Sequence, residues 1–277
     1  STRIDYKIND NNNFKGIYRY VTQTIQSTAI DIANGGYGKN PTADQPSKNP
    51  FLSLGWTSSF SSNFTNELGG GLYYSDPKFL RNTDAPSAFF TMPVVSSASF
   101  ITNPETVFLN QGRDTKAYNI QDTATYIAGN HSIHFGGQFQ VNRIIAFDNG
   151  SGTSSINPVF GLGVGANTPQ ITTAQFTNTT IFPGTVPQAQ RANANALLAL
   201  LGGIVASGSQ TFNVTSQTSG FVPGASNPRK YYWEQYGVYG SDQWRITPDL
   251  TLNFGLRYDL YTAIRNPEGL FFEPAIP

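Results

Sequence analysis

The two histidines of this chain, His131 and His134, are the side chains best suited to bind a metal or to exchange protons. The chain contains no cysteine, and neither histidine has a carboxylate close to it in the sequence. A zinc site needs three or four nitrogen, sulfur or carboxylate ligands. We therefore expect no metal here, and we interpret both histidines as polar residues of a tight turn and of the strand that leaves it.

Two glycine-rich stretches, 69–71 and 136–137, could be compared with the loops that hold phosphate groups. A phosphate loop continues with a lysine and a serine or threonine and opens a helix, and neither stretch does so. We interpret these glycines as places where a strand bends or packs closely against its neighbour. No combination of residues indicates a catalytic site, so the sequence predicts a protein that is not an enzyme and uses no cofactor or metal.

The overall composition is typical of a β protein whose polarity comes from neutral side chains. Only 12% of the 277 residues are charged, 13% are aromatic, and the formal net charge is zero. No basic footprint for nucleic acid is therefore present. The absence of cysteine suits a chain that crosses an oxidising periplasm. The longest apolar run, 196–201, is far shorter than the ~20 residues of a membrane-spanning helix.

Residues 250–260 show the clearest strand pattern, since successive side chains of a strand point to opposite faces. One face is apolar or aromatic and the other is polar. In a soluble sandwich the apolar face would be the core, whereas in an outer-membrane barrel it faces lipid and the polar face lines the lumen. The apolar face carries Leu252, Phe254, Leu256 and Tyr258, and the polar face carries Asn253, Arg257 and Asp259.

Four strand pairs are expected along the chain, and short turns within the pairs alternate with long connections between them. This is the layout of an outer-membrane barrel, with short periplasmic turns and long extracellular loops. Loops of such length are unusual in a compact soluble domain. Hairpins are expected at about 2–22, 51–75, 115–145 and 231–262, and loops at about 23–50, 76–113, 148–230 and 263–277, with a helix-like segment at 191–201.

Many aromatic residues fall near the expected strand ends, Trp56 and Trp244 among them. Aromatic girdles of this kind mark the two interfaces of a membrane barrel, although core packing explains any single one of them equally well. Together with the alternation of loop lengths, they favour the barrel over a soluble sandwich. We predict an all-β chain in which residues 1–277 form one antiparallel, up-and-down outer-membrane barrel segment of about eight strands. Both tryptophans would lie at an interface and both histidines in a turn or facing the lumen.

The stretch 236–259, YGVYGSDQWRITPDLTLNFGLRYD, resembles the barrel hairpin of Oar-like TonB-dependent receptors, which are large outer-membrane proteins common in Acidobacteria and myxobacteria. Further stretches are similar to segments of the same family, in the same order along the chain. They are RIDY at 3–6 with FKGIYRY at 14–20, LGWT at 54–57, HSIHFGGQF at 131–139 and ALLALLG at 196–202.

This resemblance implies that the chain is a slice of the wall of a larger barrel, since transporters of this kind close at about 22 strands. It implies a role in ligand uptake or surface binding, with outer-membrane lipid, further barrel strands, a plug and TonB as partners. The plug and the TonB contact carry active transport in that family, and neither is recognised within residues 1–277. An alternative is a structural protein, either a small closed barrel or a filament subunit that associates through exposed strand edges.

Overall fold

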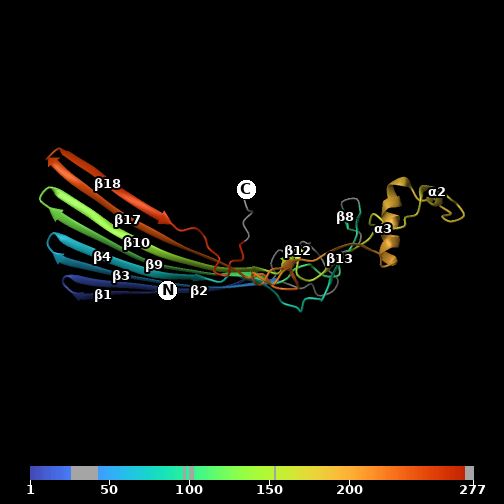
Figure 1. Ribbon diagram of the computed structural model, residues 1–277, viewed down its shortest axis with the longest axis horizontal. Helices are drawn as coiled ribbons and strands as arrows, with labels where there is room; N and C mark the ends of the chain where they lie inside the picture. Colours follow the sequence, from blue (N-terminus) through green and yellow to red (C-terminus); the bar gives the residue numbers. More distant parts are fainter. Residues whose placement is uncertain (26–42, 96–97, 100–102, 153, 272–277) are drawn as a thin grey trace.

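The structure, a computed structural model, describes residues 1–25, 43–95, 98–99, 103–152 and 154–271. Eight long antiparallel strands form one twisted sheet, which fans out at one end and narrows toward the long connections at the other (Figure 1). Each long strand after the first pairs with the long strand before it in the chain, and the short strand β5 (Lys78–Arg81) joins the same sheet by pairing with β3 and β9. The long strands are β1 (Thr2–Asn9), β2 (Asn12–Ile25), β3 (Ala43–Ser61), β4 (Phe64–Ser75), β9 (Gln111–Ala128), β10 (His131–Asp148), β17 (Arg229–Thr247) and β18 (Leu250–Tyr261).

The four hairpins all turn at the wide end of the sheet, which we call the turn end (Figure 1). In the first turn, the side-chain oxygen of Asn9 accepts hydrogen bonds from the backbone N–H of Asn11 (3.0 Å) and from the side-chain amide of Asn12 (2.9 Å). Asparagine favours turns because its side chain can bond to the backbone two residues on. In the third turn, Gly129 has a φ of 59°, a conformation that glycine adopts without steric cost. The described parts of the long connections lie at the opposite end, which we call the loop end.

Strand β3 begins within the segment that the sequence predicts as a loop, although it contains Pro46 and Pro50. This part of β3 pairs with β2 on one side. On the other side, Ala43 and Asp44 pair with β5 and the pairing with β4 starts only at Phe51, so residues 45–50 have no partner strand there in the described part of the chain. Lys48 lies two residues from each proline, so its backbone N–H and C=O point to the same side of the strand as the corresponding groups of the prolines. This is the β4 side, where the C=O of Lys48 accepts a hydrogen bond from the N–H of Asp76 (3.3 Å). The backbone nitrogens of the two prolines, which carry no hydrogen, therefore point to the side of β3 on which these residues have no partner strand. A strand tolerates proline at such a position.

The other long connections contain short elements where the sequence predicts loops. Of the connection expected at 23–50, residues 26–42 lie outside the described part of the chain. The connections at 76–113 and 148–230 meet in a three-stranded sheet, in which β13 pairs in parallel with β6 and antiparallel with β14. The short strands are β5 (Lys78–Arg81), β6 (Phe89–Thr91), β7 (Val94–Val95), β8 (Ala98–Ser99), β11 (Gly150–Ser151), β12 (Ser154–Ser155), β13 (Val159–Leu162), β14 (Val205–Ser209), β15 (Phe212–Asn213) and β16 (Val222–Pro223).

A small hydrophobic core lies in the loop end, where Phe89 (1% exposed) packs with Val107, Leu109 and Val159. Farther out are the helices α2 (Thr173–Phe176), η1 (Gln188–Gln190) and α3 (Arg191–Leu201), the last of which coincides with the helix-like segment that the sequence predicts. Within the described residues, none of the helices is long and apolar enough to cross a membrane.

The large sheet, in contrast, has almost no core of its own. Ala43 and Ala124 are the only apolar residues of the eight long strands that are buried in the described part of the chain. The accessible surface is 17445 Å², whereas a compact monomer of 30.1 kDa has about 11,700 Å². A second layer that would cover the sheet, as in a soluble sandwich, is not found among these residues.

Candidate functional site

Strand β18 presents its two sets of side chains on opposite faces of the sheet. Its apolar face is exposed along its whole length, with Phe254 at 57% and Leu256 at 80% of full exposure. The register between β17 and β18 continues this alternation from strand to strand, because directly paired residues share a face. Leu252, Phe254, Leu256 and Tyr258 therefore lie together on one face, and Asn253, Arg257 and Asp259 lie on the other.

At the turn end, the apolar face carries aromatic side chains with polar partners. The rings of His131 and Trp244 are stacked, with 5.3 Å between their centroids, and the Nδ1 atom of His131 lies 2.6 Å from a carboxylate oxygen of Asp242. Trp56 donates a hydrogen bond from its Nε1 to the side-chain oxygen of Asn12 (3.2 Å). The two tryptophans share this face but do not meet, since three strands separate β3 from β17. His131, which the sequence predicts as a residue of the turn, is the first residue of β10 and lies on the apolar face.

On β10, the apolar band is bounded by His131 at the turn end and by Arg143 toward the loop end. On β10, Arg143 is the first charged residue of this face after His131, and it lies twelve residues further along the strand. Twelve residues span about 40 Å along a strand, or about 28 Å across a membrane when the strand is tilted by about 45°. Outer-membrane barrels have an outward-facing apolar band of about 25 Å. The apolar face is therefore tall enough to span an outer membrane.

On β4 and β9, a polar pair interrupts this band. Asp122 on β9 and Asn66 on β4 lie on the apolar face, and the Asn66 side-chain amide donates a hydrogen bond to a carboxylate oxygen of Asp122 (2.9 Å). Polar groups in a membrane are costly when they have no partner. Here each of the two side chains has the other as a partner.

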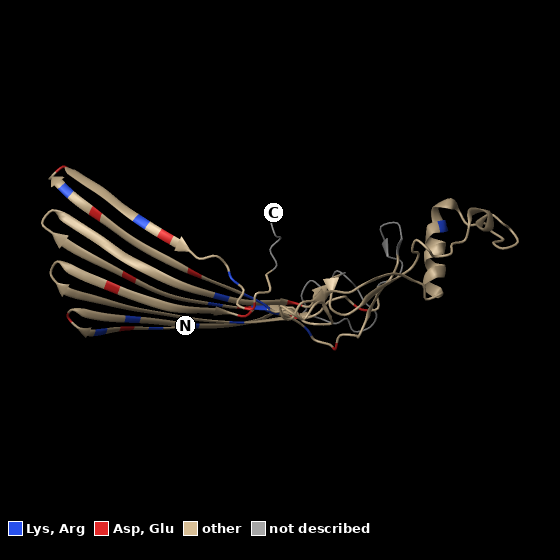
Figure 2. Cartoon of the chain, in the orientation of Figure 1, with Lys and Arg blue, Asp and Glu red and all other residues tan. Residues whose placement is uncertain are grey.

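The polar face carries ion pairs along its strands. The guanidinium of Arg257 donates two hydrogen bonds of 2.8 Å to the carboxylate of Asp259, and it also lies over the ring of Tyr239, 5.8 Å from its centroid. Arg3 and Asp5 on β1 form a similar pair, with a shortest distance of 2.6 Å. Figure 2 shows that charged residues are sparse along the sheet and gather where the strands converge toward the loops.

Glycines on the polar face let long side chains lie across a strand and reach the strand beyond it. Lys15 on β2 passes over Gly55 on β3 and reaches Glu67 on β4, with Nζ 2.6 Å from the carboxylate. In the same way, the hydroxyl of Tyr239 on β17 reaches that of Thr123 on β9, at 2.8 Å, across Gly136 on β10. Gly136, one of the glycines that the sequence predicts as places of close packing, thus supports a polar bridge, and Gly55 supports another without having been predicted.

A shallow hollow of about 410 Å³ lies near the turn end, and its lining is mostly polar. His134 is part of it, as the sequence predicts for a residue of the polar face, and its Nδ1 lies 3.0 Å from the hydroxyl of Thr125. The polar side chains of the lining can donate hydrogen bonds to, or accept them from, a molecule or segment that covers this face. Its lining consists of His134, Ser241, Asp242, Gln243, Asn253, Phe254 and Gly255.

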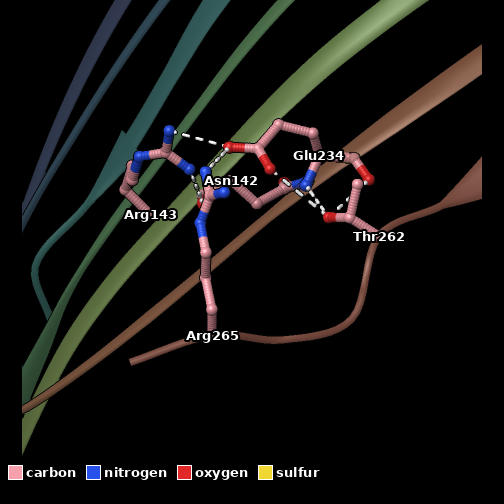
Figure 3. A network of polar contacts seen from close by, with 5 residues as sticks. All are labelled: Asn142, Arg143, Glu234, Thr262 and Arg265. Carbon is pink, nitrogen blue, oxygen red and sulfur yellow. Dashed lines mark hydrogen bonds and ion pairs between the residues drawn. The ribbon is translucent and has the colours of Figure 1, made fainter. Parts of the chain in front are cut away.

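A polar cluster that the sequence does not predict lies at the loop end (Figure 3). The side chain of Glu234 is only 8% exposed, and its Oε1 accepts hydrogen bonds from the guanidinium groups of Arg143 (2.9 Å) and Arg265 (2.7 Å). The hydroxyl of Thr262 accepts a hydrogen bond of 2.8 Å from the backbone N–H of Glu234. The cluster connects β10 and β17 to the segment that follows β18.

This arrangement defines a class of protein. An antiparallel sheet whose exposed apolar face is as tall as a membrane, and whose opposite face is polar, is the wall of a transmembrane β-barrel. No cluster of three or more His, Cys, Asp or Glu side chains that could hold a metal ion is found in the described residues.

Comparison with known proteins agrees with this class. The model of the family described as "Outer membrane beta barrel domain" matches residues 1–274, so the chain belongs to this family and is a protein of the outer membrane. No curated protein matches the chain. Among solved structures, the outer membrane transporter YddB from Escherichia coli is similar, with a TM-score of 0.53 and 9% identity over 95% of this chain and 27% of that chain. At this identity the likeness concerns the fold, and the chain spans about a quarter of the length of that transporter.

Proposed function

We propose that this chain is a non-catalytic part of the wall of an Oar-like, TonB-dependent outer-membrane transporter, which takes up or binds a ligand at the cell surface. The observation that carries the proposal is the pairing of an exposed apolar face with a polar face that is bridged by charged and hydroxyl side chains. The lipid-facing residues would be Leu252, Phe254, Leu256 and Tyr258, with Trp56 and Trp244 at an interface, and Asn253, Arg257 and Asp259 would face the lumen.

The partners of the wall follow from its uncovered surfaces. In the described residues, β1 and β18 are the two edges of the sheet, and no pairing joins them to each other. We propose that further barrel strands pair with both edges, that a plug covers the polar face and that TonB acts on the plug. The turns would then be periplasmic and the loop end extracellular, with ligand specificity in the loops.

The same open edges support one alternative. A strand edge presents unpaired N–H and C=O groups, which readily bind the edge of another chain. A surface assembly of copies joined between β1 and β18 would also bury these groups. The two functions differ in what covers the edges: strands of the same molecule or a second copy.

We test the proposal on the natural protein extracted from outer membranes. A particle that contains one copy is expected, and a cysteine that replaces Gln121, in the middle of the polar face, should react slowly with a water-soluble maleimide because the plug covers it. Particles that contain several copies joined through their edges would favour the structural alternative. Rapid reaction at this cysteine would show an open lumen and contradict a plugged transporter.

TonB dependence needs its own measurement. Affinity-tagged protein isolated from cells after cross-linking should retain TonB, which an immunoblot detects. If TonB is not retained, the TonB-dependent part of the proposal is wrong, whereas the assignment of the chain to a barrel wall is unaffected.

A further inference from the structure

Four side chains form a row across the sheet on the apolar face, at its loop end. Tyr74 on β4 is directly paired with Lys116 on β9, Lys116 with Arg143 on β10, and Arg143 with Tyr232 on β17. All four lie on the same face because directly paired residues of a sheet share a face. We call this set the cation row: two cations in the middle, with a tyrosine on each side.

The two cations of the row differ in whether a carboxylate is paired with them. Like charges that are directly opposite each other in a sheet repel. Arg143 has Glu234 as an ion-pair partner at 2.9 Å, and its guanidinium lies 4.4 Å from the centroid of the Tyr232 ring. The Nζ atom of Lys116 lies 5.8 Å from the centroid of the Tyr74 ring, and Lys116 forms no ion pair with any described residue. The carboxylate of Asp114, the next residue of this face on β9, accepts a hydrogen bond from the hydroxyl of Tyr74 (3.2 Å) and lies 3.8 Å from the Nζ atom of Lys78. The exposed Lys116 ammonium is therefore left without an ion-pair partner among the described residues.

The apolar band begins directly below the row. The next pair toward the turn end on the same face is Tyr118 with Val141, followed on β10 and β17 by the packed rings of Phe139 and Tyr236, with centroids 4.9 Å apart. An anion bound at the row is thus continuous with a surface that accepts hydrocarbon. A lipid fits both parts of this surface, because its headgroup can bind the cations and its acyl chains can lie along the apolar band. A soluble anion would use only the charged part.

We propose that the cation row binds a phosphate group of a phosphorylated glycolipid in the outer leaflet, with the acyl chains of the lipid along the apolar band below. Lysine and arginine donate charge-assisted hydrogen bonds to phosphate oxygens. The hydroxyl of Tyr232 can donate to the same group or to the sugar, whereas that of Tyr74 already donates to Asp114. The inference rests on the proposed orientation, in which the loop end is extracellular.

The test measures lipid binding by the natural protein in detergent, with diphosphoryl lipid A as the probe and native mass spectrometry as the readout. The Lys116→Gln variant should bind the probe about tenfold more weakly, which corresponds to the loss of one charge-assisted hydrogen bond. The Lys116→Arg variant should retain binding. Arg113→Gln is the matched control, since Arg113 is exposed on the same strand but on the opposite face, and it should bind within about twofold of the wild type.

Three outcomes would overturn the inference. Equal loss in Lys116→Gln and Arg113→Gln would show a general charge effect. Equal binding of lipid A from which both phosphates have been removed would show that acyl chains alone are recognised. Full competition by millimolar inorganic phosphate would show a site for a free anion. Because binding in detergent does not depend on orientation, the inference can fail while the transporter proposal stands.

Discussion

Replacement of Leu256 by arginine is expected to destabilise the protein in a bilayer by about 2–4 kcal/mol, the cost of a cation at the midplane of a barrel's lipid face. Leu256 is 80% exposed and lies in the middle of β18, away from both interfaces. In a water-soluble protein, arginine at so exposed a position would change the free energy of unfolding by no more than about 0.5 kcal/mol. Urea unfolding of the protein in lipid vesicles measures the difference.

The matched control is Asn253→Arg, on the same strand but on the polar face. It should change the free energy of unfolding much less, because a residue that faces the lumen can keep its charge solvated or paired. If both variants lose the same stability, or if neither does, the two faces of β18 do not contact different media and the assignment of lipid and lumen is wrong.

The second large effect is expected at Gly136, where β10 passes beneath the side chain of Tyr239. A Cβ at this position would lie 2.1 Å from the backbone oxygen of Asp122 and 2.9 Å from the hydroxyl of Tyr239. Gly136→Val must therefore displace backbone and break the bridge between Tyr239 and Thr123, at a cost of about 1–3 kcal/mol for overpacking and about 1 kcal/mol for the hydrogen bond. The same unfolding measurement reports it.

Gly240 provides the control for this substitution, since a Cβ added there meets no atom within 4 Å. Gly240→Ala should be neutral or slightly stabilising, because alanine lowers the entropy of the unfolded chain. A Gly136→Val variant as stable as the wild type would mean that the side chain of Tyr239 does not cross β10 in the protein.

The local alternation of β18 is enough to predict which residues share a face. Leu256 and Arg257 are neighbours in the chain and lie on opposite faces, because a strand has a period of two whatever surrounds it. The outer-membrane class and the antiparallel, up-and-down fold were likewise predictable, since the rhythm of turns and loops is a property of the chain itself. Which medium covers each face is still a prediction.

Other features depend on partners that are distant in the sequence. Pro46 and Pro50 indicate a loop, and only the pairing of β3 on one side explains why they lie in a strand. The bridge from Tyr239 to Thr123 needs the registers of three strands. Glu234 has one local signal, because a lone carboxylate at an apolar-face position indicates an ion pair, but its partner Arg265 is 31 residues away.

The central claim is that two neighbouring residues of β18 face lipid and lumen, and it is tested most directly by spin labels at Asn253→Cys and Phe254→Cys. The chain has no cysteine of its own, so each variant carries a single label. In membranes, the label at position 254 should collide with oxygen dissolved in the bilayer and be shielded from a water-soluble nickel chelate, while the label at position 253 should show no preference for oxygen. Equal oxygen accessibility at the two positions, or a label at 254 that the nickel chelate reaches freely, would contradict the account.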